Sequence, residues 1–175
     1  AVGYAMDPED IPIVRRKVAE VIERSRPETS SHRLRTLRRV LEVLPRDELF
    51  QGDAATLYDT AMRIFLIQER RKIRLFIRSD RRNRFASCLL YWPRDVYRTE
   101  LRQRIETLLM DALGAEESEF TTFVSESVLV RTYFVMRRGE QARADYDVEE
   151  LEALIVRIAQ QWQDQLGAAL VEEFG

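Results

Sequence analysis

The sequence predicts an α+β fold, in which an N-terminal helical segment precedes a four-stranded antiparallel sheet with helices on one face. Two observations lead to this prediction. Apolar residues recur at helical spacing through most of the chain, but from Lys72 to Arg78 the period changes to two. Three further stretches are rich in β-branched and aromatic residues, and short polar turns join the four stretches in pairs. The sheet should therefore consist of two hairpins.

Length and composition are those of a folded protein. The chain has 175 residues, of which 45% are hydrophobic and 33% are charged, so it can bury a core. Its one cysteine, Cys88, excludes a disulfide framework. No apolar run approaches the roughly 20 residues that span a bilayer, so we expect a cytoplasmic protein without a membrane partner. The opening residues 1–6 read as mid-chain sequence, and we expect a piece of a longer protein.

Three helices should precede the sheet. The first begins at Pro12 and ends before Pro27, the second has a leucine stripe over 34–44, and the third covers 53–68 with Asp53 as its N-cap. We place the domain boundary between the second and third helices. Residues 1–52 then form a helical segment that links to a preceding part of the parent protein, and residues 53–175 form the α+β domain.

The order of elements after residue 52 is α-β-β-α-β-β-α. This order fits a circularly permuted ferredoxin-like fold in which the last strand occupies the place of the usual first strand. We expect Asp95 or Thr99 to cap the middle helix, Gly114 to end it, and the loop 138–145 to be exposed. The predicted strands lie near 72–78, 84–92, 119–124 and 128–137, and the predicted helices cover 97–112 and 148–171.

The net charge of −2 conceals an uneven distribution. Residues 63–104 hold thirteen Lys or Arg against four acidic residues, whereas residues 139–175 hold nine acidic residues against two Arg. The acidic end can neutralise the basic middle. The alternative is a free-standing single-stranded RNA-binding domain that uses the basic 63–104 surface, because aromatic side chains are interleaved with the arginines. These aromatic residues are Phe76, Phe85, Tyr91 and Tyr97.

Two runs of sequence carry a recognisable pattern, Arg-Arg-Lys-Ile-Arg-Leu-Phe-Ile-Arg from Arg70 and Tyr-Trp-Pro-Arg-Asp-Val-Tyr from Tyr91. They resemble the ACT-like regulatory region upstream of the catalytic domain in large bacterial NAD-specific glutamate dehydrogenases. The resemblance implies an ACT-like sheet and a parent enzyme that uses NAD to deaminate L-glutamate oxidatively to 2-oxoglutarate. This chain would be a non-catalytic regulatory or assembly module of that enzyme and would hold no cofactor itself.

The residues offer no catalytic, cofactor-binding or metal-binding motif. The six glycines are scattered, and no phosphate-binding glycine loop can be written. We interpret the only histidine, His32, as a solvated residue of a polar linker, and Cys88 as a small apolar side chain in a buried strand. We therefore expect no nucleophile, no metal centre and no NAD site in this chain.

Candidate residues for an effector or an interface come from the basic middle and from the last helix. An arginine side chain can bind an effector carboxylate, but we favour pairing of Arg74, Arg78, Arg94, Arg98 and Arg102 with acidic partners in this chain or its parent. Trp162 lies midway along an apolar stripe that one sheet is too short to cover. Expected partners are the remainder of the parent, a second copy of the chain and an amino-acid effector, but no nucleic acid. The candidates are Arg74, Arg78, Arg94, Asp95, Arg98 and Trp162.

Overall fold

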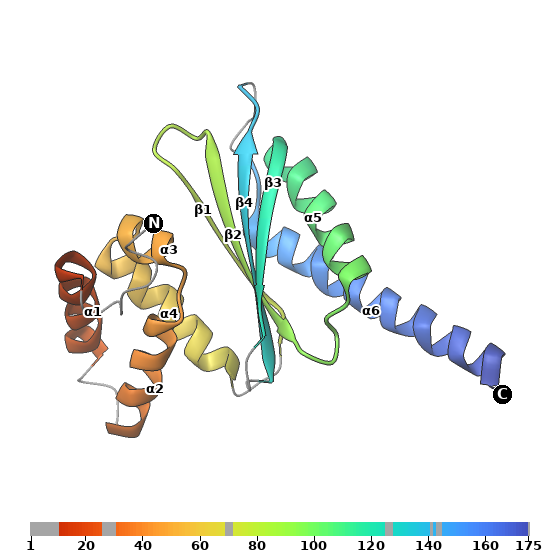
Figure 1. Ribbon diagram of the computed structural model, residues 1–175, viewed down its shortest axis with the longest axis horizontal. Helices are drawn as coiled ribbons and strands as arrows, with labels where there is room; N and C mark the ends of the chain where they lie inside the picture. Colours follow the sequence, from red (N-terminus) through yellow and green to blue (C-terminus); the bar gives the residue numbers. More distant parts are fainter. Residues whose placement is uncertain are drawn as a thin grey trace. The chain divides into compact units, whose positions relative to one another are not determined.

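The structure is a computed structural model that describes residues 11–25, 31–68, 72–124, 128–140, 142 and 145–174. The chain divides into two compact units, Ala1–Arg70 and Arg71–Gly175. The first unit is helical, and the second contains the sheet (Figure 1). In the part of the chain that the structure describes, no helix is both long and apolar enough to cross a membrane.

The helical unit contains three helices that the apolar periodicity predicts and one that it does not. α4 packs against both α1 and α2, and buried aliphatic side chains such as Val18, Leu41 and Ile64 form the core. Asp53 caps α4, as predicted, since its Oδ1 accepts the Thr56 amide at 2.7 Å. That hydrogen bond lowers the pKa of the Asp53 carboxyl. The helices are α1 (Pro12–Ser25), α2 (Ser31–Glu42), α3 (Arg46–Gln51) and α4 (Ala54–Gln68).

α3 is the unpredicted helix, because six residues are too few to show a periodic pattern. Lys17 of α1 binds the C-terminal end of α3. Its Nζ donates to the carbonyl oxygens of Leu49, Phe50 and Gly52 at 3.2, 2.6 and 2.8 Å. These carbonyls have few partners within so short a helix, so a lysine from another helix stabilises its end.

The boundary between the units lies eighteen residues after the position that we expected. We placed α4 with the sheet, whereas the structure divides the chain between Arg70 and Arg71. The physical reason is that the apolar side of α4 packs on α1 and α2 and completes the helical core. His32 also lies in the first turn of α2 and not in a linker, because that helix begins at Ser31.

The second unit confirms the predicted α+β fold. Its four strands form one antiparallel sheet in the order β1-β2-β4-β3, which is the order that a permuted ferredoxin-like arrangement requires. The last strand pairs with β2 in the middle of the sheet. The strands are β1 (Arg74–Ser79), β2 (Phe85–Pro93), β3 (Ala115–Phe123) and β4 (Leu129–Arg138).

Two helices, α5 (Thr99–Leu113) and α6 (Val148–Phe174), pack against one face of this sheet, and α6 continues past α5 (Figure 1). Cys88 is completely buried in this core, as expected. Alternate residues of the strands supply the sheet side of the core. The core side chains include Leu75, Cys88, Leu90, Trp92, Val130, Phe134 and Met136 of the sheet, Leu101, Ile105 and Leu109 of α5, and Leu151 and Ile155 of α6.

Two element boundaries differ from the prediction. Gly114 ends α5 in the left-handed conformation, as predicted, but β3 follows immediately at Ala115 instead of near residue 119. Arg138 belongs to β4 and is only 3% exposed, although we expected it in an exposed loop. Its Nε donates to the Leu113 carbonyl at 2.7 Å and its Nη1 to Asn83 Oδ1, so the buried guanidinium binds the C-terminus of α5.

Candidate functional site

The six candidate residues lie at three separate places in the sheet unit. Arg74 and Arg78 lie on β1, and Trp162 lies on α6. The other three, Arg94, Asp95 and Arg98, belong to the connection between β2 and α5. Arg94, Asp95 and Arg98 are already neighbours in the sequence, and the structure does not form one cluster from all six candidates.

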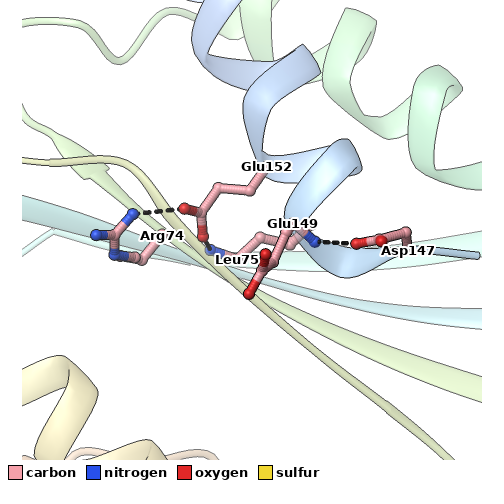
Figure 2. Close-up of polar contacts among 5 residues, drawn as sticks. All are labelled: Arg74, Leu75, Asp147, Glu149 and Glu152. Atoms are coloured by element: carbon pink, nitrogen blue, oxygen red, sulfur yellow. Dashed lines mark hydrogen bonds and ion pairs between the residues drawn. The ribbon is translucent and has the colours of Figure 1, made fainter.

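Arg74 already has an acidic partner. Its Nη1 lies 2.5 Å from Glu152 Oε1 of α6, and Glu152 Oε2 accepts the backbone amide of Leu75 at 2.9 Å (Figure 2). One carboxylate thus binds both a side chain and the backbone of β1. Arg78, further along the same strand, also has an interaction partner. In the same view, Asp147 Oδ1 accepts the Glu149 amide at 2.8 Å and caps α6.

The connection from Pro93 to Arg98 is a hydrogen-bonded turn. The Pro93 carbonyl accepts the amides of Val96 and Tyr97 at 3.0 and 3.2 Å. The Arg98 guanidinium donates to the carbonyl oxygens of Asp95 and Tyr97 at 3.2 and 2.6 Å. The predicted N-cap of α5 is wrong, because the capping position is Arg98 and no side chain caps the helix.

Trp162 packs against the edge of the core between α5 and α6. It is partly buried, and the guanidinium carbon of Arg104 lies 4.8 Å from its ring centre. Residues 163–169 of the helix are exposed, and Leu166 retains 42% of its accessible surface. The predicted apolar stripe is therefore partly covered by its own sheet unit up to Trp162 and open at Leu166.

Arg102 is a second buried arginine, only 5% exposed. Its Nη1 lies 2.5 Å from Glu106 Oε2, and its guanidinium carbon lies 3.6 Å from the ring centre of Phe120 on β3. Arg74 and Arg102 thus pair with acidic side chains of this chain, as we favoured, whereas Arg98 uses backbone carbonyls instead.

Tyr91 and Arg131 form a pair that the sequence patterns did not single out as a site. They lie opposite each other in the register of β2 and β4, on the sheet face that α5 and α6 do not cover. The two side chains interact with each other, and neither the buried Tyr91 hydroxyl nor the buried Arg131 Nη1 has a further hydrogen-bond partner among the described residues. Burial raises the pKa of Tyr91 to about 12, although the nearby Arg131 charge acts in the opposite direction.

The aromatic side chains behind the RNA-binding alternative do not form one platform. Phe76 lies edge-on to Tyr91, with ring centres 6.3 Å apart, but Tyr91 is only 5% exposed. Tyr97 instead packs on Trp92, with ring centres 4.8 Å apart, and Trp92 belongs to the core under the helices. Successive bases would need rings exposed on a common face for stacking.

Within the described residues, no group of three or more His, Cys, Asp and Glu side chains could hold a metal ion.

The family model described as "Glutamate dehydrogenase, ACT2 domain" matches residues 74–163, just over half of the chain. The chain belongs to the glutamate dehydrogenase family. A second model of this family, "Glutamate dehydrogenase, helical motif 1", matches residues 11–70, which lie within the helical unit and end where it ends. The predicted resemblance is confirmed.

Three relatives, each named NAD-specific glutamate dehydrogenase, match nearly the whole chain. The protein of Pseudomonas aeruginosa is 47% identical over 98% of the chain, and that of Halomonas elongata is 43% identical over 100%. The protein of Mycobacterium tuberculosis is 35% identical over 91%. The chain spans only 11% of the length of each relative. All six candidate residues, together with Tyr91 and Arg131, lie within the ACT2 match.

Proposed function

We propose that this chain is a non-catalytic regulatory or assembly module of an NAD-dependent glutamate dehydrogenase. The supporting observation is that nearly the whole chain resembles a stretch covering 11% of proteins named for that activity. The ACT2 match lies on the sheet unit and the helical-motif match lies on the other. The complete protein would oxidatively deaminate L-glutamate to 2-oxoglutarate with NAD, and residues outside this chain would bind both.

The regulatory part of the proposal is that the sheet unit binds an amino-acid effector. Arg131 of β4 supports this idea, since it pairs with no carboxylate of the described residues and a guanidinium binds a carboxylate through paired hydrogen bonds. The assembly part is that the remainder of a cytoplasmic enzyme and a second copy of the chain are its partners. The open stretch of α6 around Leu166 supports this part, because it presents an apolar side chain outside the core.

The test of the catalytic assignment is an absorbance assay for NADH. The purified chain, supplied with L-glutamate and NAD, should produce no NADH above the rate without protein. The complete enzyme, assayed in parallel at the same molar concentration, should produce NADH. Turnover by the isolated chain would overturn the non-catalytic assignment, and an inactive complete enzyme would overturn the proposed activity of the parent.

A further inference from the structure

Two side chains on the face of the sheet opposite the helices form a polar pair that no third group completes. Tyr91 and Arg131 are cross-strand neighbours that interact with each other, and no third group among the described residues hydrogen-bonds to the phenol hydroxyl or to Arg131 Nη1. Tyr91 is 5% exposed. Buried polar groups in folded proteins are nearly always hydrogen-bonded, so such a pair calls for an explanation.

The protonation states make both groups donors. Burial raises the pKa of Tyr91 to about 12, so the phenol keeps its proton at neutral pH. Burial also lowers the pKa of Arg131, and Tyr91 opposes this effect. A guanidinium nevertheless remains charged in proteins and can only donate. The phenol oxygen can accept one proton from the guanidinium, but the phenol proton and the other guanidinium protons still need an acceptor.

The surroundings of the pair are aromatic on two sides. The guanidinium carbon of Arg131 lies 4.5 Å from the ring centre of Phe123, its neighbour on β3, and Phe76 lies edge-on to Tyr91. Arg74, Tyr91, Arg131 and Phe123 lie opposite one another across the four strands and form one row. Its end at β3 is accessible to solvent, because Phe123 is 42% exposed. Among the described residues no carboxylate pairs with Arg131. Arg74, which lies opposite Tyr91 on β1, is the other arginine of this row, and it forms an ion pair with Glu152.

We propose that Tyr91 and Arg131 together bind a carboxylate group on the face of the sheet that α5 and α6 do not cover. The two carboxylate oxygens accept the phenol proton and a guanidinium proton, and the negative charge compensates the buried guanidinium. The proposal rests on the proposed function for the class of ligand, a free amino acid. The same chemistry could come from an acidic side chain elsewhere in the parent enzyme.

Charge decides between a carboxylate and other acceptors. A water molecule would accept both hydrogen bonds but would leave the guanidinium charge uncompensated in a poorly solvated place. A phosphate dianion would bring two charges to one cation, because Arg74 is already neutralised by Glu152. A carboxylate brings one charge and has the planar geometry that a guanidinium recognises.

The experiment uses the 175-residue chain with acetate and L-glutamate as probes at pH 7. Thermal unfolding is followed in increasing sodium acetate against sodium chloride at equal ionic strength, and the nitrogen resonances of the Arg131 side chain are followed by NMR. We expect acetate to raise the melting temperature by mass action and to shift the Arg131 resonances. Tyr91→Phe and Arg131→Met should each weaken binding at least tenfold.

Arg137→Met is the matched control, since Arg137 lies on the same strand but pairs with Glu116 and Glu117 at 3.1 and 2.8 Å. It should keep the acetate response. Tenfold tighter binding of L-glutamate than of acetate identifies a free amino acid as the source, whereas equal affinities identify an acidic side chain of the enzyme.

Identical unfolding in acetate and chloride would overturn the proposal. So would an acetate response that survives both Tyr91→Phe and Arg131→Met. These measurements are independent of the NADH assay, so failure of the carboxylate site leaves the assignment as a non-catalytic module intact. A catalytically active isolated chain, in turn, would not alter the acetate response.

Discussion

The carboxylate of Glu152 accepts the backbone amide of Leu75 at 2.9 Å, so a side chain of α6 binds the outer edge of β1. β1 is a terminal strand of the sheet, and an unpaired edge amide would otherwise need water or another strand. Because the same carboxylate also pairs with Arg74, one residue both covers this edge and fixes α6 along it.

Glu152→Ala should lower the free energy of unfolding by about 1–2 kcal/mol, the usual cost of removing the acceptor of a half-buried hydrogen bond. The ion pair adds little, because the Arg74 side chain is 41% exposed and solvent screens it. Glu149→Ala is the control, since Glu149 lies on the first turn of α6 and is exposed. Urea unfolding measures both, and equal stability of the two variants would contradict this account of the edge.

Gly114→Ala should destabilise the chain by about 1–2 kcal/mol, because a left-handed conformation is strained for any residue with a Cβ. Gly114 has a φ of 62°, and a Cβ there would lie 2.9 Å from the Cβ of Ala142. Gly167→Ala is the matched control within α6, where nothing lies within 4 Å of the added atom. It should leave stability unchanged or raise it by up to about 1 kcal/mol. Thermal melts of the two variants that shift equally would count against this argument.

The caps illustrate how much of the fold the sequence could predict. Asp53 and Gly114 were predicted correctly, because a cap acts within its own turn and needs no tertiary information. The residue that caps the start of α5 was predicted wrongly, because Asp95 and Thr99 are both of residue types that favour the N-cap position. The Pro93 turn instead places the backbone so that Arg98 occupies that position.

The Tyr91–Arg131 pair could not be predicted from local patterns. The two residues are forty positions apart, and only the register between β2 and β4 places them opposite each other. The alternation of each strand shows that each lies on the face opposite the core, but not that they are neighbours. The sequence predicted that Arg74 pairs with an acidic side chain. It could not predict that this side chain is Glu152, because the choice depends on how α6 lies along β1.

Asp80 should make stability depend on pH in acid. Its carboxylate accepts the amides of Phe85 and Arg84 at 2.9 and 2.7 Å, and these hydrogen bonds lower the pKa of the carboxyl below 3.8. A lowered pKa in the folded state means that the contribution is fully present above pH 3.8 and is lost as the pH falls through the folded value. Asp80→Asn should therefore be less stable than the wild type near pH 6, and the difference should shrink towards pH 3. Urea unfolding between these limits tests this, and a difference that stays constant with pH would exclude the carboxylate as its origin.

The two positions on the stripe of α6 should behave differently when each is changed to alanine. Trp162 packs against the core and under Arg104, so Trp162→Ala should lower the free energy of unfolding by about 1–3 kcal/mol, less than for a fully buried tryptophan. Leu166 is 42% exposed, and Leu166→Ala should change the stability of the monomer by less than about 0.5 kcal/mol.

If the open stretch of α6 binds a second copy of the chain, Leu166→Ala should weaken that association while the monomer stays folded. Light scattering over a concentration series, paired with a denaturant melt, separates folding from association. If the wild-type chain remains monomeric at high concentration, self-association through this helix is excluded, and Trp162 contributes to folding alone.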